Sequence, residues 1–482
     1  MARFNTRTLA DHPDTLNREG AAAYRQEDQL ALVSHLLTSF VQDQFYRSAD
    51  EGLAELIQLI SRVDPGFAAR AAVYARREFG MRSVTHVVAG QIAATVKGEE
   101  WTKRFFDAVV VRPDDITEIL GFYASAYGLH PLPNSLKKGL AAALRRFDAY
   151  ELAKYRGEGR LVSLMDAVNL CRPLPTPAIS RLMTGTLPPA DTWEVALTQA
   201  GRRTRDPNEL AALRRQAWHR LLAEDKLGYM ALLRNLRAIV RTFDAQLLQL
   251  AERKLVDADA IRSSRVFPFR IAVALDLLRP IAPPGIARAL EAAVELSFAN
   301  VPQMSRRTLI AVDCSGSMTG GGRVPPLDRA ILLAAAFVKR NDCDVMLFSD
   351  DAWYVQVDRA ASLDAARQRI WAAVRPSGTR FTAIFDKATK PYDRVIILSD
   401  MQAWLPDWCG STTPTPALER YRRRTGCDPK VFCLDLAGYG TAQFPARRVC
   451  QLAGFSDKVF DLMAALESDL DALIETIEAV EL

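Results

Sequence analysis

The stretch that decides the fold is TLIAVDCSGS, residues 308–317, an apolar run followed by a loop rich in acidic and hydroxyl groups. The run has the length and the β-branched content of a buried strand. Asp313, Ser315 and Ser317 can turn their oxygens toward one point, and Gly316 lets the loop wrap around it. One carboxylate and two hydroxyls are hard oxygen ligands, which suit Mg²⁺ or Mn²⁺. The stretch therefore predicts a divalent-cation site beyond the carboxyl end of a strand.

Two later segments can complete this site. Asp400 ends the apolar strand predicted in RVIILSD, residues 394–400, and Thr379 lies in the preceding loop Ser377-Gly378-Thr379. We predict five metal ligands, which are Asp313, Ser315, Ser317, Thr379 and Asp400, with Thr382 as the alternative threonine. Mg²⁺ is the expected ion. The competing interpretation is a serine-rich turn whose hydroxyls cap a helix.

Strands and helices alternate around this motif. We predict helices at 327–340, 363–374 and 462–480, and further strands at 343–348 and 430–436. This alternation indicates an α/β domain with a mostly parallel, buried sheet that begins near residues 303–306.

The first 300 residues predict helices and no strand. Apolar residues recur at helical spacing in 51–62, 67–79, 116–127, 136–147, 210–222 and 243–255, with proline or asparagine at the breaks. Short helices joined in this way are typical of stacked helix pairs, and an irregular helical bundle is the alternative.

The composition is that of an ordinary globular protein. The chain has 482 residues, 49% of them hydrophobic, and a formal net charge of +5. These values exclude a disordered chain, a collagen and a small disulfide scaffold. The seven cysteines include no C-x-x-C pair, which favours a reduced compartment. Because no apolar signal segment opens the sequence and no run is long enough to span a bilayer, we expect a soluble, cytoplasmic protein.

The positive charge lies in the helical part. Residues 1–300 contain 40 Lys and Arg against 34 Asp and Glu, whereas residues 301–482 contain 22 against 23. Basic clusters of this kind favour a polyanion, although they can also simply solvate outer helix faces. The candidate RNA-binding residues are Lys137, Lys138, Arg145, Arg146, Lys154, Arg156, Arg160, Arg172, Arg202, Arg203, Arg214 and Arg215. Tyr155 and Trp218, interleaved with them, could stack on bases.

Histidine is missing from the α/β part. The five histidines lie at positions 12, 35, 86, 130 and 219. This removes the commonest general base and the usual zinc ligands, and it excludes a Ser-His-Asp hydrolase confined to this part. We expect a protein that is not an enzyme; a nuclease or hydrolase that uses Mg²⁺ at Asp313 is the remaining enzymatic alternative.

The motif Asp-x-Ser-x-Ser, followed by a Gly-Thr loop and a later Asp after an apolar strand, resembles the metal-ion-dependent adhesion site of von Willebrand factor A domains. All five elements stand here in the same order, at Asp313, Ser315, Ser317, Thr379 and Asp400. The resemblance implies a metal that is usually not catalytic. It keeps an open position, which an acidic group of a partner protein fills.

Helical repeats followed by such a domain resemble the Ro autoantigen family, whose helical part is called TROVE. Asn17 and residues 20–24 look like its Asn-x-x-Gly-Gly-Tyr motif, residues 30–40 follow it, Phe45-Tyr46 and residues 53–60 look like its aromatic segment and next helix, and residues 137–156 are similar to its basic helix pair. The resemblance implies a multidomain fold, with a TROVE-like, all-α, HEAT-like ring in residues 1–304 and a Rossmann-like von Willebrand A domain in residues 305–482.

The resemblance also implies partners. The 3′ end of a misfolded noncoding RNA would thread the ring, a Y RNA would bind the outer basic surface, and an exoribonuclease could associate, as parts of RNA quality control. One departure concerns the Y RNA: the stretch Asn169 to Pro173 lacks the histidine of some members, which leaves this contact to Arg172. We expect a monomer with no membrane partner and no DNA specificity. A metal-dependent protein-interaction scaffold without RNA is the alternative.

Overall fold

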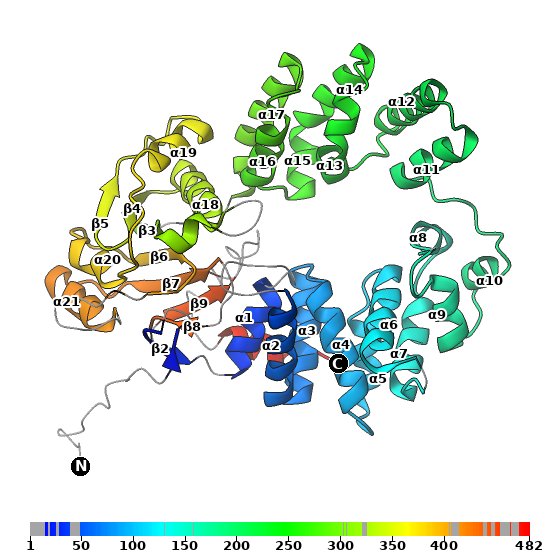
Figure 1. Cartoon of the computed structure of the whole chain (residues 1–482), viewed down its shortest axis with the longest axis horizontal. Helices are drawn as coiled ribbons and strands as arrows, with labels where there is room; N and C mark the ends of the chain where they lie inside the picture. The colour runs from blue at the N-terminus through cyan, green and yellow to red at the C-terminus, as the bar shows by residue number, and fades with distance from the viewer. Residues whose placement is uncertain are drawn as a thin grey trace. The chain divides into compact units, whose positions relative to one another are not determined.

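The structure is a computed structural model (Figure 1). It describes residues 15–17, 20–25, 28–38, 49–129, 131–157, 159–301, 303–304, 306–320, 325–403, 405, 414–436, 441–444, 449–453, 463 and 472–482. The predicted aromatic pair Phe45-Tyr46 and most of the helix predicted at 462–480 lie outside these residues. Of that helix, the structure describes α23 (Ala472–Glu478).

The chain forms two compact units. The first combines Met1–Phe105 with Met304–Leu482, and the second is Phe106–Gln303. Sequence resemblance divides the chain differently, into a TROVE-like part, residues 1–304, and an A-like part, residues 305–482. That division stays a prediction. In the folded chain, the amino-terminal residues group with the α/β part.

A six-stranded sheet forms the α/β part of the first unit. Its order is β5 (Ala352–Val355), β4 (Cys343–Phe348), β3 (Thr308–Asp313), β6 (Arg394–Ser399), β7 (Lys430–Asp435) and β9 (Val449–Ala453). Only β5 pairs antiparallel with its neighbour; the other strands run parallel. This confirms the predicted α/β domain with a mostly parallel sheet.

Helices cover both faces of the sheet, because alternate side chains of each strand point to opposite faces. Leu309, Ala311, Val395 and Ile397 alternate along β3 and β6 and pack in one core cluster with Phe385. Phe385 belongs to α20 (Thr382–Lys387), which packs on α21 (Thr415–Thr425). Residues of the other parity point to the opposite face of the sheet. There α18 (Pro326–Arg340) packs on β3 and β4, and α19 (Leu363–Trp371) packs on α18.

The amino-terminal part of the first unit is helical. It contains α1 (Asp28–Thr38), α2 (Ala49–Arg62), α3 (Pro65–Glu78), α4 (Ser83–Thr95) and the first residues of α5 (Trp101–Ala108), a helix that continues into the second unit. The helices predicted at 51–62 and 67–79 are confirmed by α2 and α3. Within this unit α1 contacts β9, and α3 contacts α23.

The prediction of no strand in the first 300 residues is wrong. β1 (Thr15–Leu16) and β2 (Ala22–Arg25) pair antiparallel, and β2 also pairs with β8 (Thr441–Ala442). Strands this short contain too few residues to produce an alternating pattern. Nearby, the buried side chain of Asn17 donates a hydrogen bond to the carbonyl oxygen of Ala403. The strand β8 that pairs with β2 lies more than 400 residues later in the chain, so local sequence gives no signal for this pairing.

The second unit is built of consecutive short helices (Figure 1). They are α6 (Pro113–Tyr127), α7 (Asn134–Leu144), α8 (Ala149–Lys154), α9 (Leu164–Cys171), α10 (Pro177–Met183), α11 (Trp193–Arg203), α12 (Pro207–Ala223), α13 (Tyr229–Val240), α14 (Ala245–Leu255), α15 (Ala258–Ser264), α16 (Pro268–Leu278) and α17 (Pro284–Ser297). The helices predicted at 116–127, 136–147, 210–222 and 243–255 are confirmed to within a few residues.

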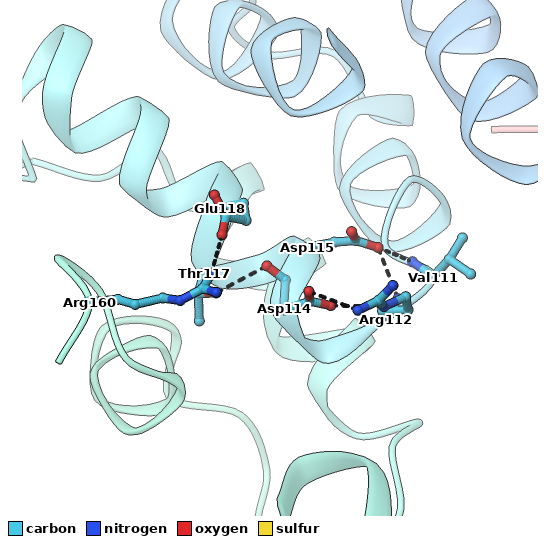
Figure 2. Close-up of polar contacts among 7 residues, drawn as sticks. All are labelled: Val111, Arg112, Asp114, Asp115, Thr117, Glu118 and Arg160. Atoms are coloured by element: carbon cyan, nitrogen blue, oxygen red, sulfur yellow. Dashed lines mark hydrogen bonds and ion pairs between the residues drawn. The ribbon is translucent and has the colours of Figure 1, made fainter. Parts of the chain in front are cut away.

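Side chains that satisfy free backbone groups define where these helices begin. Asp206, Asp244 and Asp257 each accept hydrogen bonds from the first backbone N–H groups of α12, α14 and α15. At α6, the carboxylate of Asp115 accepts the N–H groups of Val111 and Arg112, as Figure 2 shows. No helix in the described part of the chain is both long enough and apolar enough to cross a lipid bilayer.

Candidate functional site

The acidic loop predicted from the sequence lies at the carboxyl end of β3. Asp313 ends the strand, and its carboxylate accepts the backbone N–H of Ser315 at 2.9 Å and the hydroxyl of Ser399, which ends β6. The hydroxyl oxygens of Ser315 and Ser317 are 3.4 Å apart. Asp313 and Ser315 are buried, whereas Ser317 is half-buried and forms the side of the loop that solvent reaches.

Asp400 lies beside this loop because β3 and β6 are adjacent parallel strands. Its carboxylate accepts a hydrogen bond from Ser317. Burial raises the pKa of Asp400, and the negative charge of Asp313 raises it further. Burial also raises the pKa of Asp313, against the hydrogen bonds from Ser315 and Ser399. Two buried carboxylates at one point repel each other, which is unfavourable unless a proton or a cation lies between them.

The predicted threonine loop is also at this point. The backbone N–H of Gly316 donates to the carbonyl of Ser377 at 3.1 Å, which holds the serine loop against the Ser377–Thr379 loop. Thr379 and Thr382 are both buried. Among the described residues, the hydroxyl of Thr382 and the oxygen Oδ2 of Asp400 are buried polar atoms without a hydrogen-bond partner. Thr382 therefore remains the alternative to Thr379.

The donor set is one of oxygens. The described part of the chain holds no cluster of three or more His, Cys, Asp and Glu side chains suited to a metal. Two carboxylates and several hydroxyls in an otherwise buried pocket are suited to a hard cation that keeps some of its water. A bound ion would supply the partner that the buried oxygen Oδ2 of Asp400 lacks. The residues present thus fit a divalent cation.

Sequence reasoning missed Ser399 and Gln402. Ser399 donates to Asp313 and accepts the N–H of Met401 at 3.0 Å, so it orients a carboxylate of the site. The backbone N–H of Gln402 donates to Asp400 at 3.3 Å. Ser399 was visible as the residue between the apolar run and Asp400, but only the pairing of β6 with β3 places it beside Asp313.

The second candidate site is the basic surface of the second unit. Five basic residues are exposed: Lys138 on α7, Arg145 directly after α7, Arg172 directly after α9, Arg203 on α11 and Arg214 on α12. Among the residues that the structure describes, none of these five side chains has a hydrogen-bond or ion-pair partner. Cations without internal partners are open to an external anion.

Other predicted RNA-binding residues contact the protein itself. Arg146 donates to the carbonyl oxygens of Asp107 and Val110 at 2.8 and 2.7 Å and pairs with the Asp107 carboxylate. Arg156 donates to the carbonyl of Leu187 at 2.7 Å. Arg160 reaches Glu118 on α6, as Figure 2 shows. These three arginines hold neighbouring elements of the unit together.

The remaining predicted residues are intermediate cases. The ammonium of Lys154 lies over the ring of Tyr155, at 5.4 Å from its centre. Arg202 is exposed at the end of α11 and has other interactions in the protein. Arg215 is exposed on α12 and lowers the pKa of Asp244, although the hydrogen bond from Leu247 is the larger cause.

Two basic residues lie near the packing of α7 on α9: Lys137 on α7, and Arg172 directly after α9. Burial raises the pKa of the Cys171 thiol to about 12, and the positive charge of Lys137 opposes this rise. Lys137 therefore lies close to Cys171, and Cys171 directly precedes Arg172 in the chain. Lys138 directly follows Lys137. Arg172 has a φ of 51°, a left-handed conformation that usually favours glycine at this position after a helix. An exposed arginine kept in that conformation is a candidate binding residue.

The proposed stacking role of Trp218 is wrong. Trp218 is only 2% exposed and packs against Trp193, with ring centres 6.2 Å apart. Tyr155 is half-buried, and the guanidinium of Arg112 lies 4.5 Å from its ring centre. Both rings thus have neighbours within the protein. The sequence could not distinguish an aromatic residue on the inner face of a helix from one on its outer face.

Arg145 and Arg146 form a matched pair for a test. Arg146→Met should lower the free energy of unfolding by about 1 to 2 kcal/mol, because two carbonyls lose a charged donor at a partly exposed site. Arg145→Met should leave the melting temperature unchanged and weaken RNA binding about 5-fold. Thermal unfolding and a gel shift on both variants measure this. Equal effects of the two substitutions on both measurements would contradict the assignment.

Two family models match the chain. The model described as the TROVE domain matches residues 21–186 and 185–282, and the model described as the Ro60 vWA domain matches residues 307–470. The TROVE matches span more than half of the chain. The chain therefore belongs to the Ro family of TROVE-domain proteins, and its α/β part is a von Willebrand A domain of the Ro60 type.

Individual relatives are more distant. The RNA-binding protein RO60 of Deinococcus radiodurans is 23% identical, and the match covers 94% of this chain and 95% of that protein. The crystal structure of the Ro protein of that organism has a TM-score of 0.65 at 21% identity, and the match covers 91% of this chain and 99% of that chain. Telomerase protein component 1 of Rattus norvegicus is 27% identical over 153 residues, but the match spans only 6% of that protein. The structural likeness confirms the fold.

Proposed function

We propose that this protein binds noncoding RNA without cleaving it. In this proposal a structured RNA of the Y type binds the basic surface around α7 and α9, and a misfolded RNA binds through its single-stranded 3′ end. The protein would then act in RNA quality control, with an exoribonuclease as a possible partner. The observation that supports the proposal most directly is a group of exposed cations that have no partner in the described part of the chain: Lys138, Arg145, Arg172, Arg203 and Arg214.

The positive charge of these side chains predicts how RNA binds. An RNA that neutralises them releases bound counterions, so its affinity comes mainly from phosphate contacts and falls with salt. Phosphate contacts of this kind carry no sequence information, which fits a protein that holds many different RNAs. A relative named as an RNA-binding protein, which matches over 94% of the chain, supports the same conclusion.

The direct test is to purify the full chain and sequence the nucleic acid that accompanies it. We expect noncoding RNA in the preparation and a gel shift of a hairpin RNA with a 3′ tail at low salt. The absence of both would refute the proposal. Degradation of the RNA that requires Asp400 would instead support the nuclease alternative.

We further propose that the pocket of Asp313 and Asp400 holds a divalent cation, most simply Mg²⁺. Ser315, Ser317 and either Thr379 or Thr382 would supply the remaining protein oxygens. The buried carboxylate pair and the unpaired oxygens of Asp400 and Thr382 support this assignment. A bound cation would neutralise the pair and, where it faces Ser317, could accept an acidic group from a partner protein.

This site supports a second function, a metal-dependent contact with a protein. The two functions use different side chains of the chain and are separable. Loss of the cation should leave RNA binding unchanged and abolish only the protein contact. A fall in RNA affinity after Asp313→Ala would contradict that separation.

A further inference from the structure

Phe243 is an exposed aromatic residue that none of the functions above uses. It lies between α13 and α14, and 82% of its surface is exposed. Among the large apolar side chains of the described residues, this is the highest exposed fraction. A phenylalanine in water gains nothing from burial, so its position contributes nothing to the stability of the helices.

The backbone at Phe243 is also unfavourable. Its φ is 52°, in the left-handed region that glycine and asparagine adopt far more readily than an aromatic residue does. Residues held in such conformations concentrate at binding sites, because the surrounding structure must maintain them. Exposure and backbone strain therefore independently identify Phe243 as a residue kept for something other than folding.

The turn that presents Phe243 is well ordered. Its backbone N–H donates to the carbonyl of Val240 at 3.2 Å, and the hydroxyl of Thr242 donates to Ile239 at 2.7 Å. Asp244 accepts the N–H of Leu247 at 2.9 Å, and one of its oxygens lies 3.3 Å from the ring of His219. These contacts fix the residues on both sides of Phe243, so the ring is presented from a defined position.

Arginines precede Phe243 in the chain: Arg234 and Arg237 lie on α13, and Arg241 directly follows its last residue. Arg234, Arg237 and Arg241 are exposed and follow one another at spacings of three and four residues, which places them on one face of the helix. None of the three has a hydrogen-bond or ion-pair partner among the described residues. Arg215 on α12 lies near Asp244 and adds positive charge to the same turn. A row of cations that ends at an exposed aromatic ring is the arrangement that binds single-stranded nucleic acid.

We propose that Phe243 stacks on a base of single-stranded RNA while Arg234, Arg237 and Arg241 bind its phosphates. The proposal rests on the proposed RNA-binding function and adds to it a contact for an unpaired strand. Stacking requires no particular base, because each base has an aromatic face. The site would therefore accept single-stranded ends of any sequence, with a preference for purines, which present the larger surface.

The test uses the full chain and fluorescein-labelled oligo(A) and oligo(U) RNA of about twelve nucleotides, a length that spans such a site. Phe243→Ala should weaken oligo(A) binding by about 5- to 100-fold, the range measured for loss of one stacking aromatic. Phe243→Leu, which is equally apolar, should weaken it similarly, whereas Phe243→Trp should bind as well as the wild type. The slope of affinity against salt should not change, because no charge is lost.

Further variants exclude a structural role. Phe243→Asn suits the left-handed backbone and should melt no lower than the wild type while binding RNA as weakly as Phe243→Ala. Leu277→Ala removes another exposed apolar side chain, on α16, and should affect neither property. If the wild type binds neither RNA, the proposed function itself fails. If it binds and Phe243→Ala binds equally well, only the stacking proposal is overturned.

Discussion

Simultaneous charge reversal at Lys138, Arg145 and Arg172 is expected to weaken the binding of a hairpin RNA with a 3′ tail on the order of 100-fold. The reason is that three phosphate contacts are lost, at roughly 1 kcal/mol each. These side chains are exposed and have no partner among the described residues, so folding should not depend on them. A titration by fluorescence anisotropy at about 50 mM salt would measure the loss, since phosphate contacts are strongest at low salt.

Salt dependence gives a second readout of the same variant. Each phosphate contact on a single strand contributes about 0.7 to the slope of log affinity against log salt, so three lost contacts should reduce it by about 2. The control reverses three exposed arginines of the α/β part, Arg359, Arg369 and Arg423, and changes the net charge equally. The surface assignment would be refuted if the control weakened RNA binding as much as the triple variant did.

Mg²⁺ is expected to raise the melting temperature of the wild type by several degrees. An ion at one hundred times its dissociation constant stabilises the state that binds it by about 2.7 kcal/mol, or about 2 to 4 °C for each kcal/mol in a domain of this size. Asp313→Asn should abolish the shift, because the ion loses a charged ligand. Scanning calorimetry with Mg²⁺ and with EDTA would measure it. An identical shift in wild type and variant would place the ion elsewhere.

The pH dependence in EDTA tests the carboxylate pair. The pKa of Asp400 is raised by burial and by Asp313, so its charged form is disfavoured in the folded protein. Below the unfolded pKa of about 3.9, this aspartate is protonated in both the folded and the unfolded protein and costs no stability. As the pH rises toward the folded pKa, ionisation favours the unfolded state, so stability is lost. Without metal, the wild type should thus lose stability from about pH 4 to about pH 8. Asp400→Asn should lose less stability over this range, because only Asp313 still has a raised pKa, and at pH 8 it should melt higher than the wild type.

The pocket proposed to hold a cation could be predicted from the sequence in more detail than the basic surface could. Asp313 and Asp400 each end an apolar run, and parallel strands bring their carboxyl ends to one edge of a sheet. The proximity of Asp313 and Asp400 therefore follows from the order of the strands alone. The choice between Thr379 and Thr382 could not be made from the sequence. Thr379 lies in a loop and Thr382 begins α20, and the path of that loop depends on tertiary contacts such as that between Gly316 and Ser377.

The basic residues illustrate why a pattern of charges in the sequence does not identify a binding site. Arg145 and Arg146 are neighbouring arginines that the sequence cannot distinguish, yet only Arg146 donates hydrogen bonds to the carbonyls of Asp107 and Val110. Trp218 lies in a basic segment but faces inward. Phe243 could not be identified either, since an isolated phenylalanine in a helical pattern predicts burial. Exposure and a positive φ become visible only in the folded chain.

The grouping of residues 1–105 with residues 304–482 has a consequence for how the protein is made. A ribosome releases the amino-terminal helices first, but β2 and α3 contact β8 and α23, which are synthesised near the end. The second unit, residues 106–303, emerges complete in between. We therefore expect the intervening helices to fold during synthesis while the amino-terminal segment waits for its partners. A chain that stops before residue 304 would leave that segment's apolar surface open to chaperones.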